Sequence, residues 1–164
     1  MKLEELKCIS ENIDIEEYIK FREQVKMAMI EKDWLGDFTK EELEQLLQNG
    51  SKIWIYYKEE KPICSMMIIP STKKNMDKFD LSLDFHQVID YGPMMVNKNY
   101  VGNGLQYQML KMLDNYCSKK YSYALTTIHP DNNYSINNLV KDDFKLIGQK
   151  ELKRGMRNIY LKKY

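Results

Sequence analysis

The stretch of sequence that decides the fold is Val96-Asn97-Lys98-Asn99-Tyr100-Val101-Gly102-Asn103-Gly104-Leu105-Gln106. A β-prone run precedes it and apolar residues at helical spacing follow it, so the two glycines should join a strand to a helix. The first N–H groups of a helix have no partners inside it and lie at the positive end of its dipole. This loop therefore suits a phosphate, because glycines let the backbone approach closely and adopt positive φ. A tight turn or a helix cap without a ligand is the alternative.

The same loop excludes two familiar nucleotide motifs. It has no lysine of the P-loop type, and it lacks the third glycine of a dinucleotide-binding turn. The sequence therefore predicts neither an NTP site nor an NAD site here.

The elements around the loop predict a mixed α/β (α+β) chain. Gln87–Val96 should form the strand before it, and one apolar stripe (Leu105, Met109, Met112, Leu113, Tyr116) predicts the helix after it. Two helices are expected earlier in the chain. The first is Ile15–Ile30, which Asp14 can cap, and the second begins at a capping box formed by Thr39 and Glu42. The other expected elements are strands at Lys52–Tyr57, Ile63–Ile69, Tyr123–Ile128, Phe144–Glu151 and Asn158–Lys162, and a short helix containing Ile136, Leu139 and Val140. The segment Ser71–Phe85 is polar and is not assigned.

The loop resembles the acetyl-CoA loop of the GNAT N-acetyltransferase superfamily, whose usual form is V-x-P-x-Y-R-G-x-G-x-G/A. Val96, Tyr100, Gly102 and Gly104 match that form. Val101 replaces Arg or Gln, and Gln106 replaces Gly or Ala. Neither change removes a backbone N–H, and backbone N–H groups do most of the pyrophosphate binding in the family.

A second block, about thirty residues further on, resembles the same family. His129-Pro130-Asp131-Asn132-Asn133-Tyr134-Ser135 and the residues up to Phe144 follow the form H-P-x-N-x-x-S/A-(seven residues)-G-F. Only the glycine differs, because Asp143 stands in its place. That position ends a helix, where left-handed geometry is common, and Asp tolerates this geometry better than most residues do.

The resemblance covers roughly Lys52–Tyr164 and implies a GNAT fold in one domain, residues 1–164. That fold has a mixed, mostly antiparallel sheet and about four helices, and the strands ending at Val96 and Ile128 run parallel and splay apart. It implies acetyl-CoA as co-substrate, with the pantetheine arm pairing with backbone near Met95 and Val96. The implied cofactor-binding residues are Met95, Val96, Val101, Gly102, Asn103, Gly104, Leu105, Gln106, Asn132, Ser135 and Asn138. Asn132 is also a candidate helix cap.

The resemblance implies acetyl transfer to a primary amine of a small molecule or protein, by direct attack on the thioester. Asp90 is the candidate base, since relatives often place a carboxylate on that strand. If the strand alternates regularly, Asp90, Gly92, Met94 and Val96 share a face. His86 is an alternative base or a loop-edge surface residue, and His129 is expected to shape a turn with Pro130.

The usual acid of the family is missing. Many relatives carry a Tyr that protonates the leaving thiolate at the position occupied here by Leu139. Tyr134 or Tyr91 could replace it, although a tyrosine is more often a packing residue in a chain with 12 of them. A catalytically weak or inactive acyl-CoA-binding module is therefore the second hypothesis. An interaction protein without either property is the third.

Composition sets the remaining expectations. The formal net charge of +1 gives no basic face for nucleic acid or an anionic membrane, so neither is expected as a partner. The three cysteines lack metal-ligand spacing, so no metal is expected, and their odd number suits a reducing, cytoplasmic compartment. A homodimer is possible, as in many relatives, and the acceptor is not specified.

Overall fold

The computed structural model describes all residues from 1 to 164 and divides the chain into two compact units. The first unit comprises Met1–Ile68 and Gly92–Met109, and the second comprises Ile69–Tyr91 and Leu110–Tyr164. Neither unit is a continuous stretch of chain, because each is assembled from segments that the other unit separates in the sequence.

Four strands and three helices build the first unit. β1 (Lys7–Ile9), β2 (Lys52–Lys58), β3 (Lys61–Pro70, which runs on into the second unit) and β5 (Met95–Val96) pair antiparallel in the order β1-β2-β3-β5. The expected hairpin of β2 and β3 is confirmed. Its two turn residues, Glu59 and Glu60, have φ of 50° and 58°, as a tight primed turn requires.

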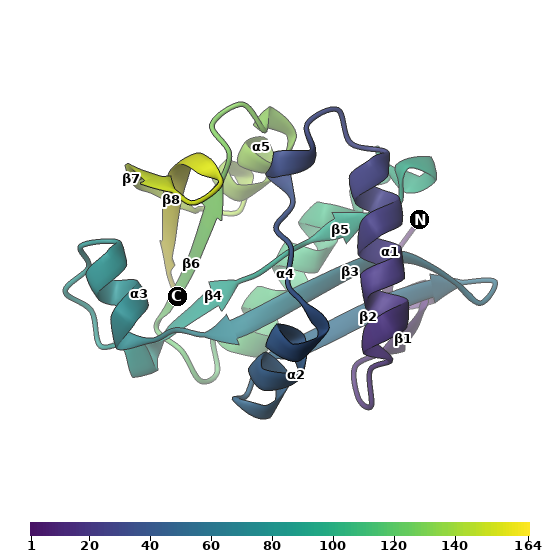
Figure 1. Cartoon of the computed structure of the whole chain (residues 1–164), viewed down its shortest axis with the longest axis horizontal. Coiled ribbons are helices and arrows are strands. Elements are labelled where there is room, and N and C mark those ends of the chain that lie inside the picture. Colours follow the sequence, from purple (N-terminus) through teal and green to yellow (C-terminus); the bar gives the residue numbers. More distant parts are fainter. The chain divides into compact units, whose positions relative to one another are not determined.

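Two helices of the first unit begin where their caps predict. α1 (Ile15–Met27) starts at Asp14, whose carboxylate accepts the Glu17 N–H at 3.1 Å, and Figure 1 shows the helix lying across β2 and β3. α1 ends three residues before the expected Ile30. The residues there gain no burial from continuing, since Met27 and Ile30 are 76% and 92% exposed. α2 (Lys40–Gln48) has the complete Thr39/Glu42 capping box.

The core of this unit lies between the helices and the strands. Tyr18 and Phe21 of α1 and Leu43 of α2 are fully buried. The strands contribute Ile53, Ile55, Ile63, Met66, Met67 and Met95. The third helix, α4 (Leu105–Cys117), begins in this unit with the buried side chains of Leu105 and Met109, and it continues into the second unit.

Four strands and two further helices build the second unit. β4 (Val88–Tyr91), β6 (Tyr123–Ile128), β8 (Gly155–Lys163) and β7 (Lys145–Leu152) pair in that order, and only β4 with β6 is parallel. α5 is Asn133–Lys141. α3 (Lys73–Lys78) lies in the segment that the sequence left unassigned, behind a Thr72 cap, and it raises the number of α-helices to five. Its Met76 packs with Val88, Leu125 and Ile159.

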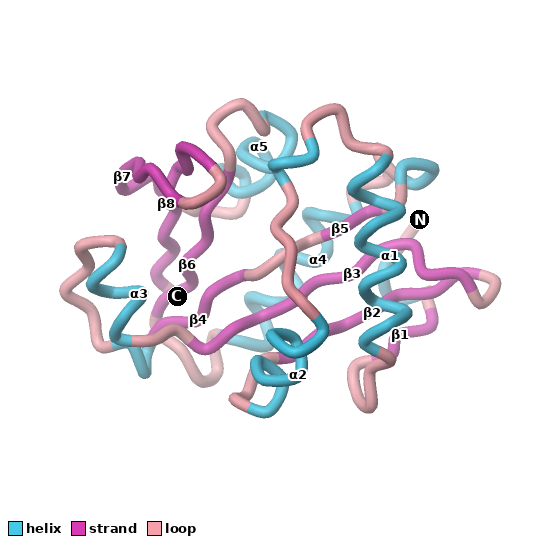
Figure 2. The backbone as a smooth tube through the Cα atoms, in the orientation of Figure 1, coloured by secondary structure: helices cyan, strands magenta, loops and turns pink.

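The structure corrects three expectations about individual elements. The predicted strand Gln87–Val96 is broken into β4 and β5, and Figure 2 shows a loop between them. Gly92, Pro93 and Met94 form this break, because Pro93 has no N–H to donate to a ladder. The parallel pairing with β6 therefore belongs to β4, and its register ends at Asp90↔Leu125. Tyr116 is exposed, although the sequence pattern places it on the apolar stripe of α4.

No helix of the structure is both long enough and apolar enough to cross a lipid bilayer.

Candidate active site

The glycine loop of the first unit has the backbone geometry expected of an anion site. Gly102 and Gly104 have φ of +89° and +70°, and a Cβ on Gly102 would meet nothing within 4 Å. Glycine is therefore required there by the conformation of the backbone and not by lack of space. The first helical hydrogen bond of α4 runs from the Gln108 N–H to the Gly104 carbonyl, at 3.1 Å. By the geometry of any α-helix, the N–H groups of the first turn point beyond this end.

Side chains hold the loop in shape from within. The Asn103 amide donates to the Tyr100 carbonyl at 3.0 Å, and the Asn97 carboxamide oxygen accepts the Asn99 N–H at 3.0 Å. These bonds close a short 3-10 turn, Lys98–Tyr100, directly before the glycines. Val101, which replaces the usual Arg or Gln, is exposed.

β5 supplies a strand edge beside the loop. Its residues pair Met95↔Ser65 and Val96↔Cys64 with β3, and the Asn97 N–H donates to the Ile63 carbonyl at 2.8 Å. β3 is the only strand partner of β5. The opposite edge of β5 can therefore accept an extended ligand such as a pantetheine arm.

In the second unit, the His129–Ser135 block forms the start of α5. The Asn132 carboxamide oxygen accepts the Ser135 N–H at 3.2 Å, so the expected capping role is present. The bond uses only the oxygen and leaves the NH₂ group of Asn132 as a donor. The Asp131 N–H donates to His129 Nδ1 at 3.1 Å, in agreement with a turn-shaping role for this histidine. The Asn138 amide donates to the Tyr134 carbonyl at 3.2 Å.

Asp143, which replaces the motif glycine, adopts the left-handed conformation that its position demands, with φ of 64°. The Phe144 N–H donates to the Leu139 carbonyl at 3.0 Å and closes the end of α5. The expected geometry at Asp143 is confirmed, and the substitution has left the helix end intact.

Asp90 is a partly buried carboxylate on β4. The Asn75 amide of α3 donates to its Oδ2 at 2.6 Å, and its Oδ1 is buried. Burial raises the pKa of Asp90 to about 6, although Ser71, Asn75 and Lys78 oppose the rise. Asp90 thus has a pKa near neutrality, which is one property of a general base. Because Gly92–Met94 is a loop, the expected shared strand face from Asp90 to Val96 is not formed.

The two candidate acids differ sharply. Tyr134 lies on α5 and is 46% exposed. Tyr91 is buried, donates to Asp114 Oδ1 at 2.8 Å and is bonded to the Tyr164 hydroxyl. Burial, followed by the effects of Tyr164 and Asp114, raises the pKa of Tyr91 far above its usual range. Tyr91 is therefore a packing residue. His86 is also set apart, since its side chain is 73% exposed beside Asp84 in the turn before β4.

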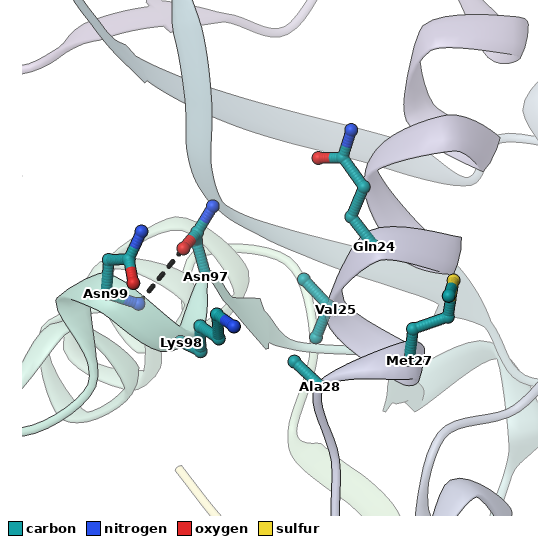
Figure 3. A pocket seen from close by; sticks show the side chains of 7 residues that line it. All are labelled: Gln24, Val25, Met27, Ala28, Asn97, Lys98 and Asn99. Atoms are coloured by element: carbon teal, nitrogen blue, oxygen red, sulfur yellow. Dashed lines mark hydrogen bonds between the residues drawn. The ribbon is translucent and has the colours of Figure 1, made fainter.

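An open pocket of about 400 Å³ lies between the end of α1 and the turn that follows β5, all within the first unit (Figure 3). Its lining residues are Gln24, Val25, Met27, Ala28, Asn97, Lys98 and Asn99. No sequence pattern indicates the α1 side of this pocket, because exposed helix residues such as Gln24 are usually solvated. Asn75 and Ser71, the neighbours of Asp90, were missed because their segment was not assigned.

The chain matches known proteins in structure but not in sequence. No family model matches the sequence, and no curated protein is similar to it. The chain superposes on smu.2055 from Streptococcus mutans UA159 with a TM-score of 0.72 at 12% identity, covering 96% of this chain and 98% of that chain. A GNAT-family acetyltransferase from Streptococcus pneumoniae gives a TM-score of 0.69 at 16% identity, over 96% and 99% of the two chains. The chain has the GNAT fold.

A third GNAT-fold match carries the cofactor in its crystal. Aminoglycoside acetyltransferase AAC(6')-Ib in complex with coenzyme A gives a TM-score of 0.72 at 15% identity, over 96% of this chain and 95% of that chain. Further structures of that enzyme hold paromomycin with acetyl-CoA, or ribostamycin or kanamycin with coenzyme A. These ligands belong to those proteins. For this chain, the expected GNAT fold is confirmed.

Proposed function

We propose that this chain is an acetyl-CoA-dependent N-acetyltransferase acting on a primary amine of a small molecule or protein. One observation carries the proposal, namely the pair of left-handed glycines at the N-terminus of α4 in the position of the family's acetyl-CoA loop. The unpaired edge of β5 and the spare NH₂ group of Asn132 support it, because a pantetheine arm needs both backbone and side-chain partners.

The proposed binding roles follow from the groups that each segment offers. Backbone N–H groups from Val101 to Gln106 would hold the pyrophosphate, and backbone at Met95 and Val96 would pair with the pantetheine arm. Asn132, Ser135 and Asn138 would hydrogen-bond the same arm. The domain would act as a single catalytic unit of residues 1–164, and we expect it to work in the cytoplasm.

The proposed chemistry is direct transfer. The neutral amine nitrogen attacks the thioester carbonyl carbon, the C–S bond breaks, and the thiolate leaves. Asp90 accepts the proton that the amine loses, directly or through one water, because its raised pKa lies near neutrality. Tyr134 is the candidate donor to the thiolate. A thiolate whose thiol has a pKa near 8–9 also leaves without an acid.

A second candidate function is acyl-CoA binding without turnover. Leu139, where many relatives carry the acidic Tyr, is buried in the structure and provides no proton. This observation bears on catalysis alone and leaves the binding residues unaffected.

Two measurements test the two functions. Calorimetric titration should give micromolar binding of acetyl-CoA under either function, and absence of binding would refute both. A panel of primary amines, assayed by release of the CoA thiol, should then give turnover for the enzyme. Tight binding without turnover on any amine would favour the binding module.

A further inference from the structure

The open pocket of the first unit is large enough for a small ligand. Its volume of about 400 Å³ falls within the range of small-molecule sites, roughly 300–1,000 Å³. Figure 3 shows two facing walls, with Gln24, Val25, Met27 and Ala28 on the last turns of α1 and the Asn97–Asn99 turn opposite. Both walls belong to the same unit.

The polar groups of the pocket are available and are mostly donors. The ammonium group of Lys98 has no acidic partner, and the carboxamides of Gln24 and Asn99 have no hydrogen bond within the protein. Asn97 uses its carboxamide oxygen to accept the Asn99 N–H, so its NH₂ group is left to donate. A ligand that fits these groups must supply acceptors.

The pocket lining carries only positive charge. Lys98 is the only charged residue that lines it, and no Asp or Glu does. Of the acids near the pocket along the chain, Glu23 pairs with Arg22 at 3.3 Å and Asp37 pairs with Lys26, and Glu31 and Asp33, which follow α1, do not line the pocket. A ligand with several ammonium groups would meet a cation here and no carboxylate to bind it.

We propose that this pocket binds the carboxylate of the acceptor, so that the substrate class is a small amine that carries an acidic group, such as a free amino acid. The inference rests on the proposed acetyltransferase function and specifies its acceptor. Lys98 and the carboxamide donors bind the carboxylate, and Val25, Met27 and Ala28 offer an apolar wall to the rest of the molecule. The same arrangement disfavours a polycationic acceptor of the aminoglycoside kind, because its ammonium groups would face Lys98.

An anionic oxygen could also come from the phosphates of coenzyme A, because Lys98 lies close in sequence to the glycine loop. The two sources differ in what a substitution would weaken. If Lys98 binds the acceptor, its removal affects the amine and leaves acetyl-CoA affinity unchanged. If Lys98 binds the cofactor, the loss falls on acetyl-CoA.

The test uses the full-length protein, the Lys98→Met variant and a matched control, Lys20→Met. Lys20 is an exposed lysine of α1 that lies outside the pocket. The probes are the common amino acids, each paired with its own amide, and kanamycin. Equilibrium binding of each probe is measured without acetyl-CoA, so that this arm does not depend on turnover.

We expect at least one amino acid to bind about tenfold more tightly than its amide, and Lys98→Met to abolish that preference, since one charge-assisted hydrogen bond is worth about this much. Lys20→Met should retain the preference. Lys98→Glu should reverse it in favour of the amide and of kanamycin, an outcome that a merely structural role for Lys98 would not produce.

Equal binding of acids and amides, binding of neither, or a loss in Lys98→Met confined to acetyl-CoA would each overturn the inference. The proposed function fails separately, if acetyl-CoA does not bind or if no amine is acetylated. A Lys98-dependent preference for carboxylates without turnover would therefore uphold the pocket and reject the enzyme.

Discussion

Asp90, the proposed base, has a pKa that links its burial to the stability of the fold. Burial raises its pKa from the ordinary value of 3.8 to about 6. Between these two pH values the folded chain holds a proton that the unfolded chain has lost. Stability therefore falls as the pH rises from about 4 to 6, and at pH 7 the ionised carboxylate costs roughly 2–3 kcal/mol.

Asp90→Asn should consequently raise stability at pH 7 by roughly 2 kcal/mol while lowering turnover by about 100-fold, because the charge disappears and with it the base. The Asn75 amide can still donate to the new side chain, so the local structure is preserved. Urea unfolding at pH 7 and pH 4 measures the first effect, which should vanish at pH 4. The exposed acid Asp77 gives the control, Asp77→Asn, which should change neither quantity. An unchanged rate in Asp90→Asn would remove Asp90 as the base.

At the scale of elements, local patterns succeeded where the signal was self-contained. The capping box predicted the start of α2, and helical spacing predicted α4 to within a residue of its ends. The sequence pattern did not predict elements that are short or that lack clear start and stop residues. β1 has only three residues and lies at a sheet edge, and α3 has six residues, of which most are polar. The break at Pro93 could have been found, since a proline inside a strand pattern signals an edge or an interruption.

The glycine loop provides the element-scale prediction. Gly102→Ala should weaken acetyl-CoA binding about tenfold, because an alanine at φ of +89° costs about 1–2 kcal/mol and the loop would relax away from its anion-binding geometry. Calorimetric titration measures the change. Gly148→Ala on β7 is the matched control, since a Cβ there meets nothing within 4 Å and its φ is not left-handed. Equal affinities for the Gly102→Ala and Gly148→Ala proteins would contradict the assignment of the loop.

At the scale of the whole molecule, the sequence patterns predicted none of the contacts between segments that are distant in the chain. The N-terminal segment is held by the Leu3 N–H, which donates to Gln108 Oε1 at 2.8 Å, and the C-terminus by the Tyr164 N–H, which donates to the Ser122 carbonyl at 3.0 Å. Neither pair has a local pattern. The pocket at α1 and the partners of Asp90 were missed for the same reason, because residues far apart in the chain assemble them.

A buried ionic cluster in the second unit is the largest such assembly. Lys162 of β8 lies 2.5 Å from Asp114 Oδ2 and 3.2 Å from Asp142 Oδ2, and Lys111 reaches Asp142 Oδ1 at 2.9 Å. The side chain of Asp142 is fully buried, whereas that of Lys111 is half exposed. Burial raises the pKa of Asp142, the two lysines oppose the rise, and Asp114 adds to it. Lys162 is thus the one buried cation between two carboxylates.

Removing that cation should destabilise the fold more than any surface change. Lys162→Met leaves Asp114 and Asp142 facing each other, and breaking a buried ion pair in this way costs about 3–5 kcal/mol. The loss should be largest at pH 7 and smaller near pH 5, because Asp142 has a raised pKa in the folded chain and takes up a proton as the pH falls. Lys111→Met should cost about 1 kcal/mol or less, since its exposed charge is screened by water. Adding Asp142→Asn to Lys162→Met should restore part of the stability. Urea unfolding of the four proteins at both pH values measures these differences, and a Lys162→Met protein as stable as Lys111→Met at pH 7 would show that the cluster contributes no more than a surface pair.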